Sequence, residues 1–305
     1  MIVIYGIPSE PPLALVINEL HRRNIPHIVL NQRKLSSFSL ELTFEGALVG
    51  GTISDGESNL GIEEISGIYA RPTYHRFLPE YWRMGDDPTR QEAFRRADSA
   101  MTFLLNNIQS RVLNRPRYMF SNISKPFQSI FIRECGFLVP DTLITNNLAA
   151  ARDFRARVQR VICKAISGER TIVRTISEED LTRIEGGCIV PIQLQEYIAG
   201  TDIRVHVVGD RTYPCAVFHE GIDYRDPDAP KRPRLKKLDS LPSLIGECCV
   251  SLCRKLNLPL AGIDLRVTPT GDIYCFEVNP NPGYSYYEIG ASQSISGAIV
   301  DYLKA

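Results

Sequence analysis

The sequence predicts a mixed α/β fold, with a Rossmann-like beginning followed by α+β segments. Three observations predict this class. The first residues alternate between strand and helix patterns, the middle of the chain holds several short strands of antiparallel type, and the last third contains a helix, two strands and another helix. We therefore expect one parallel sheet and, after it, mainly antiparallel sheets.

The N-terminal third begins with a strand, a helix and a second strand, at residues 2–5, 12–23 and 27–30. The turn at residues 6–12 lacks the glycine spacing that seats a pyrophosphate in dinucleotide-binding folds. A dinucleotide-dependent oxidoreductase is therefore a poor alternative. Further elements are expected as a hairpin over 38–53, strands at 68–70 and 112–114, and a helix over 89–109.

The remaining two thirds predict helices separated by short strands. A helix over 125–135 should turn Phe127, Ile130, Phe131 and Cys135 inward, and Gly136 follows as its C-terminal cap. A helix over 238–256 carries Cys248, Cys249 and Cys253 on its apolar stripe, where free cysteines pack as small hydrophobes. A final helix is expected over 292–303. Strands are predicted at 143–145, 158–166, 171–177, 192–198, 203–208, 212–218, 262–268 and 273–278.

Composition excludes several classes of protein. The 305 residues contain 35 Lys plus Arg and 35 Asp plus Glu, so there is no large basic excess for binding nucleic acid. No apolar window is long enough to span a bilayer, and the N-terminus does not resemble a signal peptide. The 8 cysteines are scattered, which is typical of reduced thiols. We expect a cytoplasmic protein without nucleic-acid or membrane partners.

Two neighbouring strands near the C-terminus deliver oxygen ligands to one place. Asp264 lies on the first strand, and Glu277 and Asn279 lie two residues apart on the second, so the latter two point to the same face. Mg²⁺ takes few protein oxygens and completes its shell with water and phosphate. The alternative is that Asn279-Pro280 only marks a turn. The sequence predicts a magnesium site, with Mn²⁺ as an alternative and two ions expected.

Several motifs follow one another along the chain. They are Lys125 before a helix, Gly136 with Pro140-Asp141-Thr142, Lys164, residues 195–198, residues 202–205, Asp264 and residues 277–279. These motifs, in this order, resemble those of the ATP-grasp ligases. The sequence is most similar to the group that includes the ribosomal-protein glutamate ligase, glutathione synthetase and the microviridin-type (graspetide) peptide cyclases. Weaker similarities to the peptide-cyclising branch lie at residues 69–72, 114–116, 125–128 and 142–146.

This resemblance implies an ATP-grasp fold, in which a Rossmann-like pre-ATP-grasp domain precedes two α+β subdomains that clamp ATP. The expected domains are 1–115, 116–195 and 196–305. Lys125 and Lys164 would meet the phosphates and the adenine edge of ATP, and Asp202 would receive the ribose hydroxyls. The residues implied to face adenine are Gln195, Glu196, Tyr197 and Ile198, although Glu196 and Tyr197 are alternatively plain strand-edge residues.

Acyl-phosphate chemistry also needs cations that stabilise the charge on the transferred phosphoryl group. Arg204, Arg225 and Arg266 are the candidates, in that order. Relatives of the glutathione-synthetase type place an arginine near His219, so this histidine is a departure; it is either a packed residue or a substrate contact. Further residues expected to contact substrate are Arg71, Asn281 and Gly283.

Basic residues are concentrated between Lys231 and Lys237. Such a run is usually a solvated loop. The alternative hypothesis is a mobile loop that attracts an acidic peptide, and neutral substitutions would then raise the peptide KM in a salt-dependent way.

The sequence therefore predicts an ATP-dependent ligase that joins a carboxylate to an amine or a hydroxyl through an acyl phosphate. We expect a peptide or protein substrate and, by analogy, a homodimer. One alternative is a ligase for small carboxylates, such as amino acids or dipeptides. Another is a nucleotide-binding module without turnover.

Overall fold

The computed structural model describes residues 1–46, 48–83, 85, 87–158, 160–164, 174–177, 181, 191–221, 224 and 231–305, without the side chains of Lys164 and Arg174. Its mixed helices and strands confirm the predicted α/β class. In order, the elements are β1 (Ile2–Gly6), α1 (Pro11–Arg22), β2 (His27–Asn31), η1 (Gln32–Ser37), β3 (Ser39–Glu45), β4 (Leu48–Ser54), β5 (Asn59–Gly61), η2 (Ile62–Glu64), β6 (Gly67–Arg71), η3 (His75–Phe77), α2 (Pro79–Trp82), α3 (Pro88–Asn107), β7 (Arg111–Leu113), η4 (Pro116–Ile123), α4 (Lys125–Glu134), β8 (Thr142–Thr145), α5 (Leu148–Arg157), β9 (Val161–Lys164), β10 (Arg174–Thr175), β11 (Ile192–Glu196), β12 (Thr201–Val208), β13 (Arg211–Phe218), β14 (Arg234–Lys237), α7 (Ser243–Lys255), β15 (Leu260–Val267), β16 (Ile273–Asn279), α8 (Ser285–Ala291) and α9 (Ile295–Lys304).

The N-terminal sheet is parallel, with strand order β2-β1-β6-β7. Both of its faces are covered, as the apolar strands of a parallel sheet require. Helix α3 packs on one face, where Phe94 and Met101 are buried against Val3 and Tyr5. The predicted hairpin is present as β3 and β4, and β5 extends it to three antiparallel strands.

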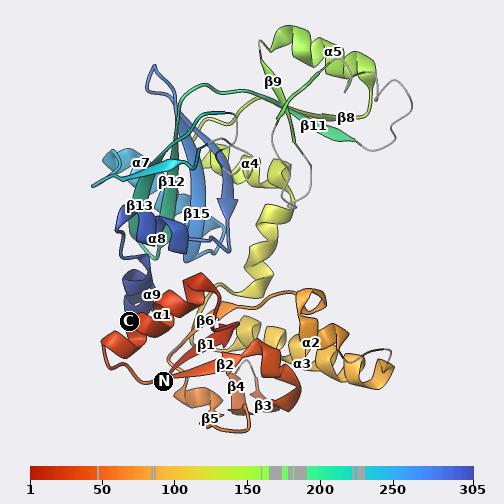
Figure 1. The fold of residues 1–305 in the computed structure, drawn as a ribbon, viewed down its shortest axis with the longest axis vertical. Coiled ribbons are helices and arrows are strands. Elements are labelled where there is room, and N and C mark those ends of the chain that lie inside the picture. The colour runs from red at the N-terminus through yellow and green to blue at the C-terminus, as the bar shows by residue number, and fades with distance from the viewer. Residues whose placement is uncertain are drawn as a thin grey trace.

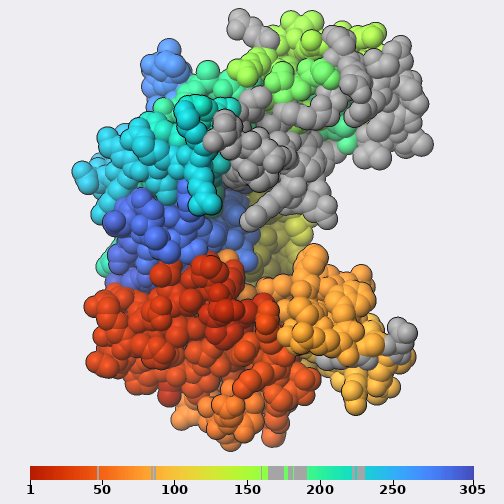
Figure 2. Space-filling model, viewed as in Figure 1, coloured from red at the N-terminus to blue at the C-terminus, as the bar shows by residue number. Residues whose placement is uncertain are grey.

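The end of the chain returns to this first sheet. Helices α1 and α9 lie together on its other face and share one core, in which Leu13, Val16, Ile299 and Leu303 are fully or nearly fully buried. Figure 1 shows α9 beside α1, with the two termini on the same side of the molecule. In the space-filling view the C-terminal residues rest directly on the N-terminal part (Figure 2). The domain boundaries at residues 115 and 195 stay a prediction.

A small antiparallel sheet, β10-β9-β11-β8, stands apart at the top of Figure 1 and carries α5. Phe154 of α5 packs into its own core with Val161 and Leu194 of the sheet. Asn147 caps α5, because its side chain accepts a hydrogen bond from the amide of Ala150.

The large sheet is antiparallel with the order β14-β13-β12-β15-β16. Its apolar face consists of alternate residues such as Val205, Val207 and Ile263, which pack against α7 and α4. Residues in between form the opposite face, which is polar and holds most of the predicted site. These two surfaces are called the apolar face and the polar face below.

Three expectations about helices were wrong in detail. Helix α7 begins at Ser243 rather than 238, because Pro242 occupies the N-cap. The Pro/Gly-rich loop after β16 continues into helix α8, which the sequence did not predict. Helix α4 buries Gln128 and Ile132; of the four residues expected to point inward, Phe131 and Cys135 pack against the core, whereas Phe127 and Ile130 are exposed.

Two further findings concern composition. Of the helices in the described ranges, none combines the length and apolar character needed to cross a membrane. The seven cysteines that the structure describes carry free thiols, and Cys249 and Cys253 are buried in the core beneath the apolar face.

Candidate active site

Strand β12 places three polar side chains in the interior. Asp202, Arg204 and His206 alternate with Ile203, Val205 and Val207, so the first three share the polar face. They are 7%, 6% and 0% exposed. Buried polar groups are costly unless they have partners, and each of the three has one across the sheet or beside it.

Arg204 is paired with Asp264 of the neighbouring strand. Its Nη1 donates to Asp264 Oδ1 at 2.7 Å, and its Nε donates to His206 Nε2 at 3.4 Å. Burial opposes the charge of Arg204, but the nearby Asp264 carboxylate and two tyrosines outweigh it and raise the pKa of the guanidinium. Burial, reinforced by Arg204, holds the pKa of His206 well below its ordinary value. Arg204 is therefore charged and His206 is a neutral acceptor.

Gly262 makes room for this arginine. A Cβ atom at position 262 would lie 1.9 Å from Arg204 Nη2, so any side chain there would displace the guanidinium. Gly262 and Asp264 lie two residues apart on β15, and Asp264 is the register partner of Arg204. The arginine thus lies across the glycine to reach the carboxylate.

Two tyrosines complete the surroundings of Asp264. Tyr287 donates to the hydroxyl of Tyr224 at 3.2 Å, and Tyr224 donates to Asp264 Oδ1 at 3.2 Å. Burial raises the pKa of Tyr287 to about 12, so the hydroxyl keeps its proton. Asp264 therefore accepts from both Arg204 and Tyr224.

The three predicted metal ligands are brought together on the polar face. Asp264 pairs with Glu277 across β15 and β16, and Asn279 pairs with Gly262 one step along the same face. Asn279 Oδ1 accepts from the amide of Asn281 at 2.9 Å. In the described part of the chain, no group of three His, Cys, Asp or Glu side chains could hold a metal. Two carboxylates and one amide oxygen fit Mg²⁺, whose remaining ligands are usually water and phosphate.

Lys125 lies beside this oxygen cluster, with its Nζ 3.5 Å from Glu277 Oε2. It is the first residue of α4, after the N-cap Ser124. Gln128, one turn later and fully buried, fixes the helix to β16: it donates to the carbonyl of Val278 at 2.8 Å and accepts from its amide at 2.7 Å. This pairing occupies backbone groups of β16 and positions Lys125 next to Glu277.

A second cluster forms around Asp202. Arg266 binds the carboxylate in a bidentate manner, at 2.6 and 2.8 Å, and His219 Nε2 lies 2.7 Å from Asp202 Oδ2. Arg266 Nη1 also donates to the carbonyl of Ile198 at 2.8 Å. Four predicted site residues thus meet in one network, and the guanidinium of Arg266 is engaged with protein groups.

Strand β11 and the segment after it present the predicted adenine side. Gln195 donates to Thr142 Oγ1 at 3.0 Å, and its buried Oε1 has no hydrogen-bond partner among the described residues. Glu196 accepts from the amide of Asp141 at 3.2 Å. The ring of Tyr197 lies 3.8 Å from the guanidinium of Arg160.

Lys164 is at the end of β9, paired with Gln193 of β11. The predicted Arg225 lies outside the described residues. So does the segment 167–170, where the resemblance to the ATP-grasp ligases would place a glycine-containing turn over the phosphates.

The predicted substrate residues Arg71, Asn281 and Gly283 meet where the N-terminal sheet approaches the loop after β16. Arg71 donates twice to Glu10 Oε1, at 2.7 and 3.1 Å, and once to the carbonyl of Pro282 at 3.0 Å. Asn114, at the end of β7, bonds the carbonyl of Pro280 at 2.6 Å. Both side chains therefore hold the loop that contains Asn281 and Gly283.

The basic run is not simply a loop. Arg234–Lys237 form β14, the edge strand of the large sheet, and Arg234 lies 4.5 Å from the ring of Phe218. Lys231 pairs with Glu220 in an exposed ion pair. Charged residues on an edge strand also protect it from pairing with other chains.

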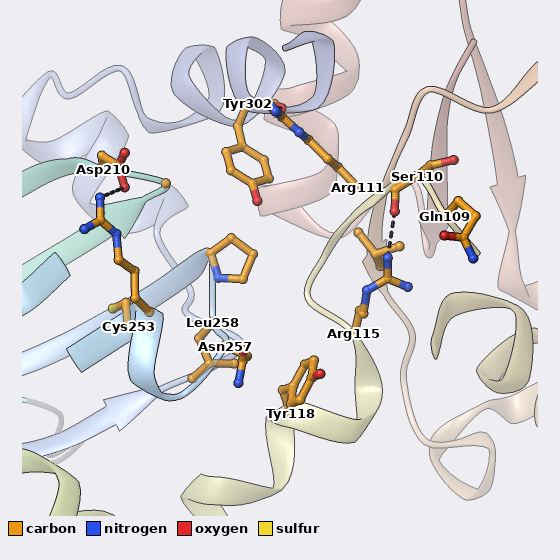
Figure 3. Close-up of a pocket in the computed structure, with 14 residues that line it drawn as sticks. Gln109, Ser110, Arg111, Arg115, Tyr118, Asp210, Cys253, Asn257, Leu258 and Tyr302 are labelled. Carbon is orange, nitrogen blue, oxygen red and sulfur yellow. Dashed lines mark hydrogen bonds and ion pairs between the residues drawn. The ribbon is translucent and has the colours of Figure 1, made fainter. Parts of the chain in front are cut away.

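One cavity, of about 490 Å³, lies away from all these residues. It is at the junction of β7, the end of α7 and α9, where Arg111, Arg115, Arg254 and Tyr302 line it (Figure 3). Arg115 donates to three carbonyls near the end of α3, and Arg254 pairs with Asp210. None of the predicted site residues lines this cavity.

Sequence reasoning missed His206, Gly262, Tyr224, Tyr287 and Gln128. The alternation of Asp202, Arg204 and His206 on a strand was a usable signal for the first. For the others the partner lies elsewhere in the chain, as with Tyr287, which follows Asp264 by more than twenty positions.

The chain has the fold of an ATP-grasp ligase. It superimposes with a TM-score of 0.80 on ATP-grasp ligase PsnB complexed with a minimal precursor, at 26% identity, covering 99% of this chain and 97% of that one. It matches macrocyclase MdnC of Microcystis aeruginosa MRC, bound with precursor peptide MdnA, with a TM-score of 0.82 at 22% identity, covering 99% and 98%. The PsnB ligase was also solved with Mg, ADP and a minimal precursor.

A third similar structure is a RiPP-associated ATP-grasp ligase of Chryseobacterium gregarium in complex with ADP and a leader and core peptide, with a TM-score of 0.80 at 21% identity, covering 99% of this chain and 96% of that one. No family model matches the sequence. Among characterised proteins, beta-citrylglutamate synthase B of Danio rerio is 22% identical over 268 residues, which are 83% of this chain. The chain spans 62% of the length of that relative.

Proposed function

We propose that the chain is an ATP-dependent ligase that joins a carboxylate to an amine or a hydroxyl of a peptide. The polar face carries this proposal, because it gathers Arg204, Lys125 and three hard oxygen ligands at one place. Full-length similarity to ligases solved with precursor peptides, ADP and Mg supports it.

Asp264, Glu277 and Asn279 would hold Mg²⁺, with two ions expected and Mn²⁺ as an alternative. The bound metal neutralises charge on the phosphates of ATP. Lys125 and Lys164 would contact phosphate as point charges, and Gln195 to Ile198 would face adenine. The buried Oε1 of Gln195, which has no hydrogen-bond partner among the described residues, supports this, since it could accept a hydrogen bond from an amino group.

The reaction has two halves. A substrate carboxylate first attacks the γ-phosphorus of ATP, which forms an acyl phosphate and releases ADP. An amine or hydroxyl then attacks the acyl carbon, and phosphate leaves. Arg204 would stabilise the negative charge that develops in both halves, because it is held at the oxygen cluster by Asp264. Arg225 remains a second candidate.

The direct test is mass spectrometry of a short peptide encoded beside the gene for this chain, after incubation with ATP and Mg²⁺. Loss of water indicates cyclisation, and gain of a residue indicates ligation. Asp264→Asn and Glu277→Gln should abolish ADP release, and the circular-dichroism spectra of both variants should match that of the wild type because the fold is kept. Asp272→Asn, an exposed acid in the turn between β15 and β16, is the matched control. Wild-type turnover in either of the first two variants would refute the metal assignment.

A small-molecule ligase is the second candidate, and the similarity to beta-citrylglutamate synthase B favours it. Such an enzyme would release ADP with free amino acids or small carboxylates and no peptide. A panel of both substrate types separates the two candidates.

The proposal also includes expectations about the domain boundaries, the oligomeric state and the location of the protein. We expect lobes at 1–115, 116–195 and 196–305, a homodimer, and a cytoplasmic location. Limited proteolysis, light scattering and cell fractionation respectively test them. The resemblance to the ATP-grasp ligases is their support.

A further inference from the structure

His219 and Asp202 form a buried pair on the polar face. Their side chains are 10% and 8% exposed, and His219 Nε2 lies 2.7 Å from Asp202 Oδ2. His219 follows the last residue of β13, and Asp202 lies opposite Val217 of that strand. The sheet register thus brings the two side chains together.

The other ring nitrogen of His219, Nδ1, is buried and makes no hydrogen bond within the described part of the chain. Because a carboxylate can only accept, Nε2 carries the proton that Asp202 receives, so in the neutral form of the ring the lone pair is on Nδ1. A buried acceptor without a partner costs free energy, so its retention calls for a ligand.

The positive charge of Arg266 compensates the negative charge of Asp202. Its bidentate contact with Asp202 neutralises the carboxylate, so Asp202 can orient the ring through a hydrogen bond without a net negative charge beside it. A base that is oriented by a second group, which is itself held by a third, is the general arrangement of activated nucleophile sites.

His219 is also close to the oxygen cluster. Its ring centroid lies 5.9 Å from that of Tyr224, and the Tyr224 hydroxyl donates to Asp264 Oδ1 at 3.2 Å. One aromatic side chain therefore separates the imidazole from the proposed metal ligand. His206, whose Nδ1 also has no partner among the described residues, is fully buried, and its Nε2 already accepts from Arg204.

We propose that His219 is the general base of the second half-reaction. This inference rests on the proposed function. The nucleophilic hydroxyl or amine of the substrate loses its proton to Nδ1 as its oxygen or nitrogen bonds to the acyl carbon. The bond from that carbon to the phosphate oxygen breaks, and phosphate leaves with the electron pair. The proton then passes from the imidazolium to phosphate or water, which restores the neutral ring. Asp202 and Arg266 are positioning residues for this base.

His219→Gln tests the assignment, because its side-chain amide nitrogen can still donate to Asp202. Hydroxylamine attacks acyl phosphates without a base, so hydroxamate formation reports the first half-reaction alone. We expect hydroxamate within about threefold of wild type, whereas peptide bond or ester formation falls by roughly 10²–10⁴-fold. His75→Gln is the matched control, since His75 pairs with Asp98 at 3.1 Å far from the polar face, and it should keep both activities.

The other outcomes are equally informative. Equal loss of hydroxamate and product in His219→Gln would overturn the base assignment, as would normal product formation. Asp202→Asn should lower product formation and leave the KM for ATP unchanged. A raised KM for ATP with unchanged product formation at saturating ATP would instead favour binding of the ATP ribose by Asp202. If the wild type forms neither ADP nor hydroxamate with any substrate tested, the proposed function fails and this inference with it.

Discussion

The two faces of the large sheet are built by alternate residues of the same strands, yet they bury opposite kinds of side chain. On β15, Ile263 is packed between strands and helices of the core, while its neighbours Gly262 and Asp264 belong to the polar face. Ile263 is fully buried, whereas Asp264, Glu277 and Asn279 of the polar face are only partly buried. Burial of apolar surface stabilises the apolar face. The polar face is stable only because each buried charge has an ion-pair or hydrogen-bond partner.

Because of this difference, substitutions of neighbouring residues on one strand should act differently on the free energy of unfolding and on turnover. Substitutions on the apolar face should lower the free energy of unfolding and leave the turnover of folded molecules unchanged. Substitutions on the polar face should lower turnover, and those that remove one partner of a buried pair should also lower the free energy of unfolding, because the remaining charge is left unpaired. Adjacent residues of one strand are therefore the sharpest test.

Arg204→Lys should have the largest effect. Lysine keeps the positive charge but cannot bind Asp264 and contact His206 at once, so charge in the transition state is less well stabilised. We expect ADP release to fall by roughly 10²–10³-fold. Steady-state ADP production measures it. Arg211→Lys on the exposed end of β13 is the control, and a loss of less than threefold in Arg204→Lys would contradict the role of this arginine.

Gly262→Ala comes next, because the new methyl group overlaps the position of the guanidinium. Misplacement of Arg204 by about 1 Å should cost on the order of 10–10²-fold in ADP release. Gly246→Ala is the control, since a Cβ there meets nothing within 4 Å and the helix should gain roughly 0.5–1 kcal/mol. Full activity of Gly262→Ala would mean that the arginine can bind Asp264 from another direction.

Much of this arrangement could be predicted from the sequence, because strand alternation is a local signal. Glu277 and Asn279 were placed on one face by their spacing, and the strand register sets Asp264 opposite Glu277. The roles of these residues stay predictions. Lys125 was placed at a helix start and lies there.

What could not be predicted depends on contacts between distant segments. Gln128 is buried, and Phe127 and Ile130 are exposed, because the amide of Gln128 pairs with the backbone of Val278 150 positions away. Apolar periodicity therefore predicted the inward position of Phe131 and Cys135 correctly and that of Phe127 and Ile130 wrongly. The partners of Arg71, which are Glu10 and the carbonyl of Pro282, are similarly invisible to local patterns.

Ile263→Val probes the apolar face directly beside the site. Removing one methylene group from a fully buried side chain should lower the free energy of unfolding by about 1 kcal/mol. Turnover per folded molecule should remain as in the wild type, since Asp264 and Gly262 are unaltered. Urea denaturation and ADP release measure the two quantities. A fall in turnover without a fall in stability would show that the faces are coupled.

His206→Gln should have the smallest effect, and only in acid. Burial depresses the pKa of His206 in the folded state, so the unfolded chain binds the proton more tightly, and stability falls as pH drops below the ordinary value of 6.5. Because of His206, the free energy of unfolding of the wild type should be lower by about 0.8 kcal/mol at pH 6 than at pH 8. Glutamine does not titrate, so the variant should lack that part of the acid dependence. Urea midpoints of both proteins from pH 8 to pH 5.5 measure the difference. Parallel curves would mean that His206 binds a proton equally well in the folded and unfolded states, which is incompatible with its role as a buried neutral acceptor for Arg204.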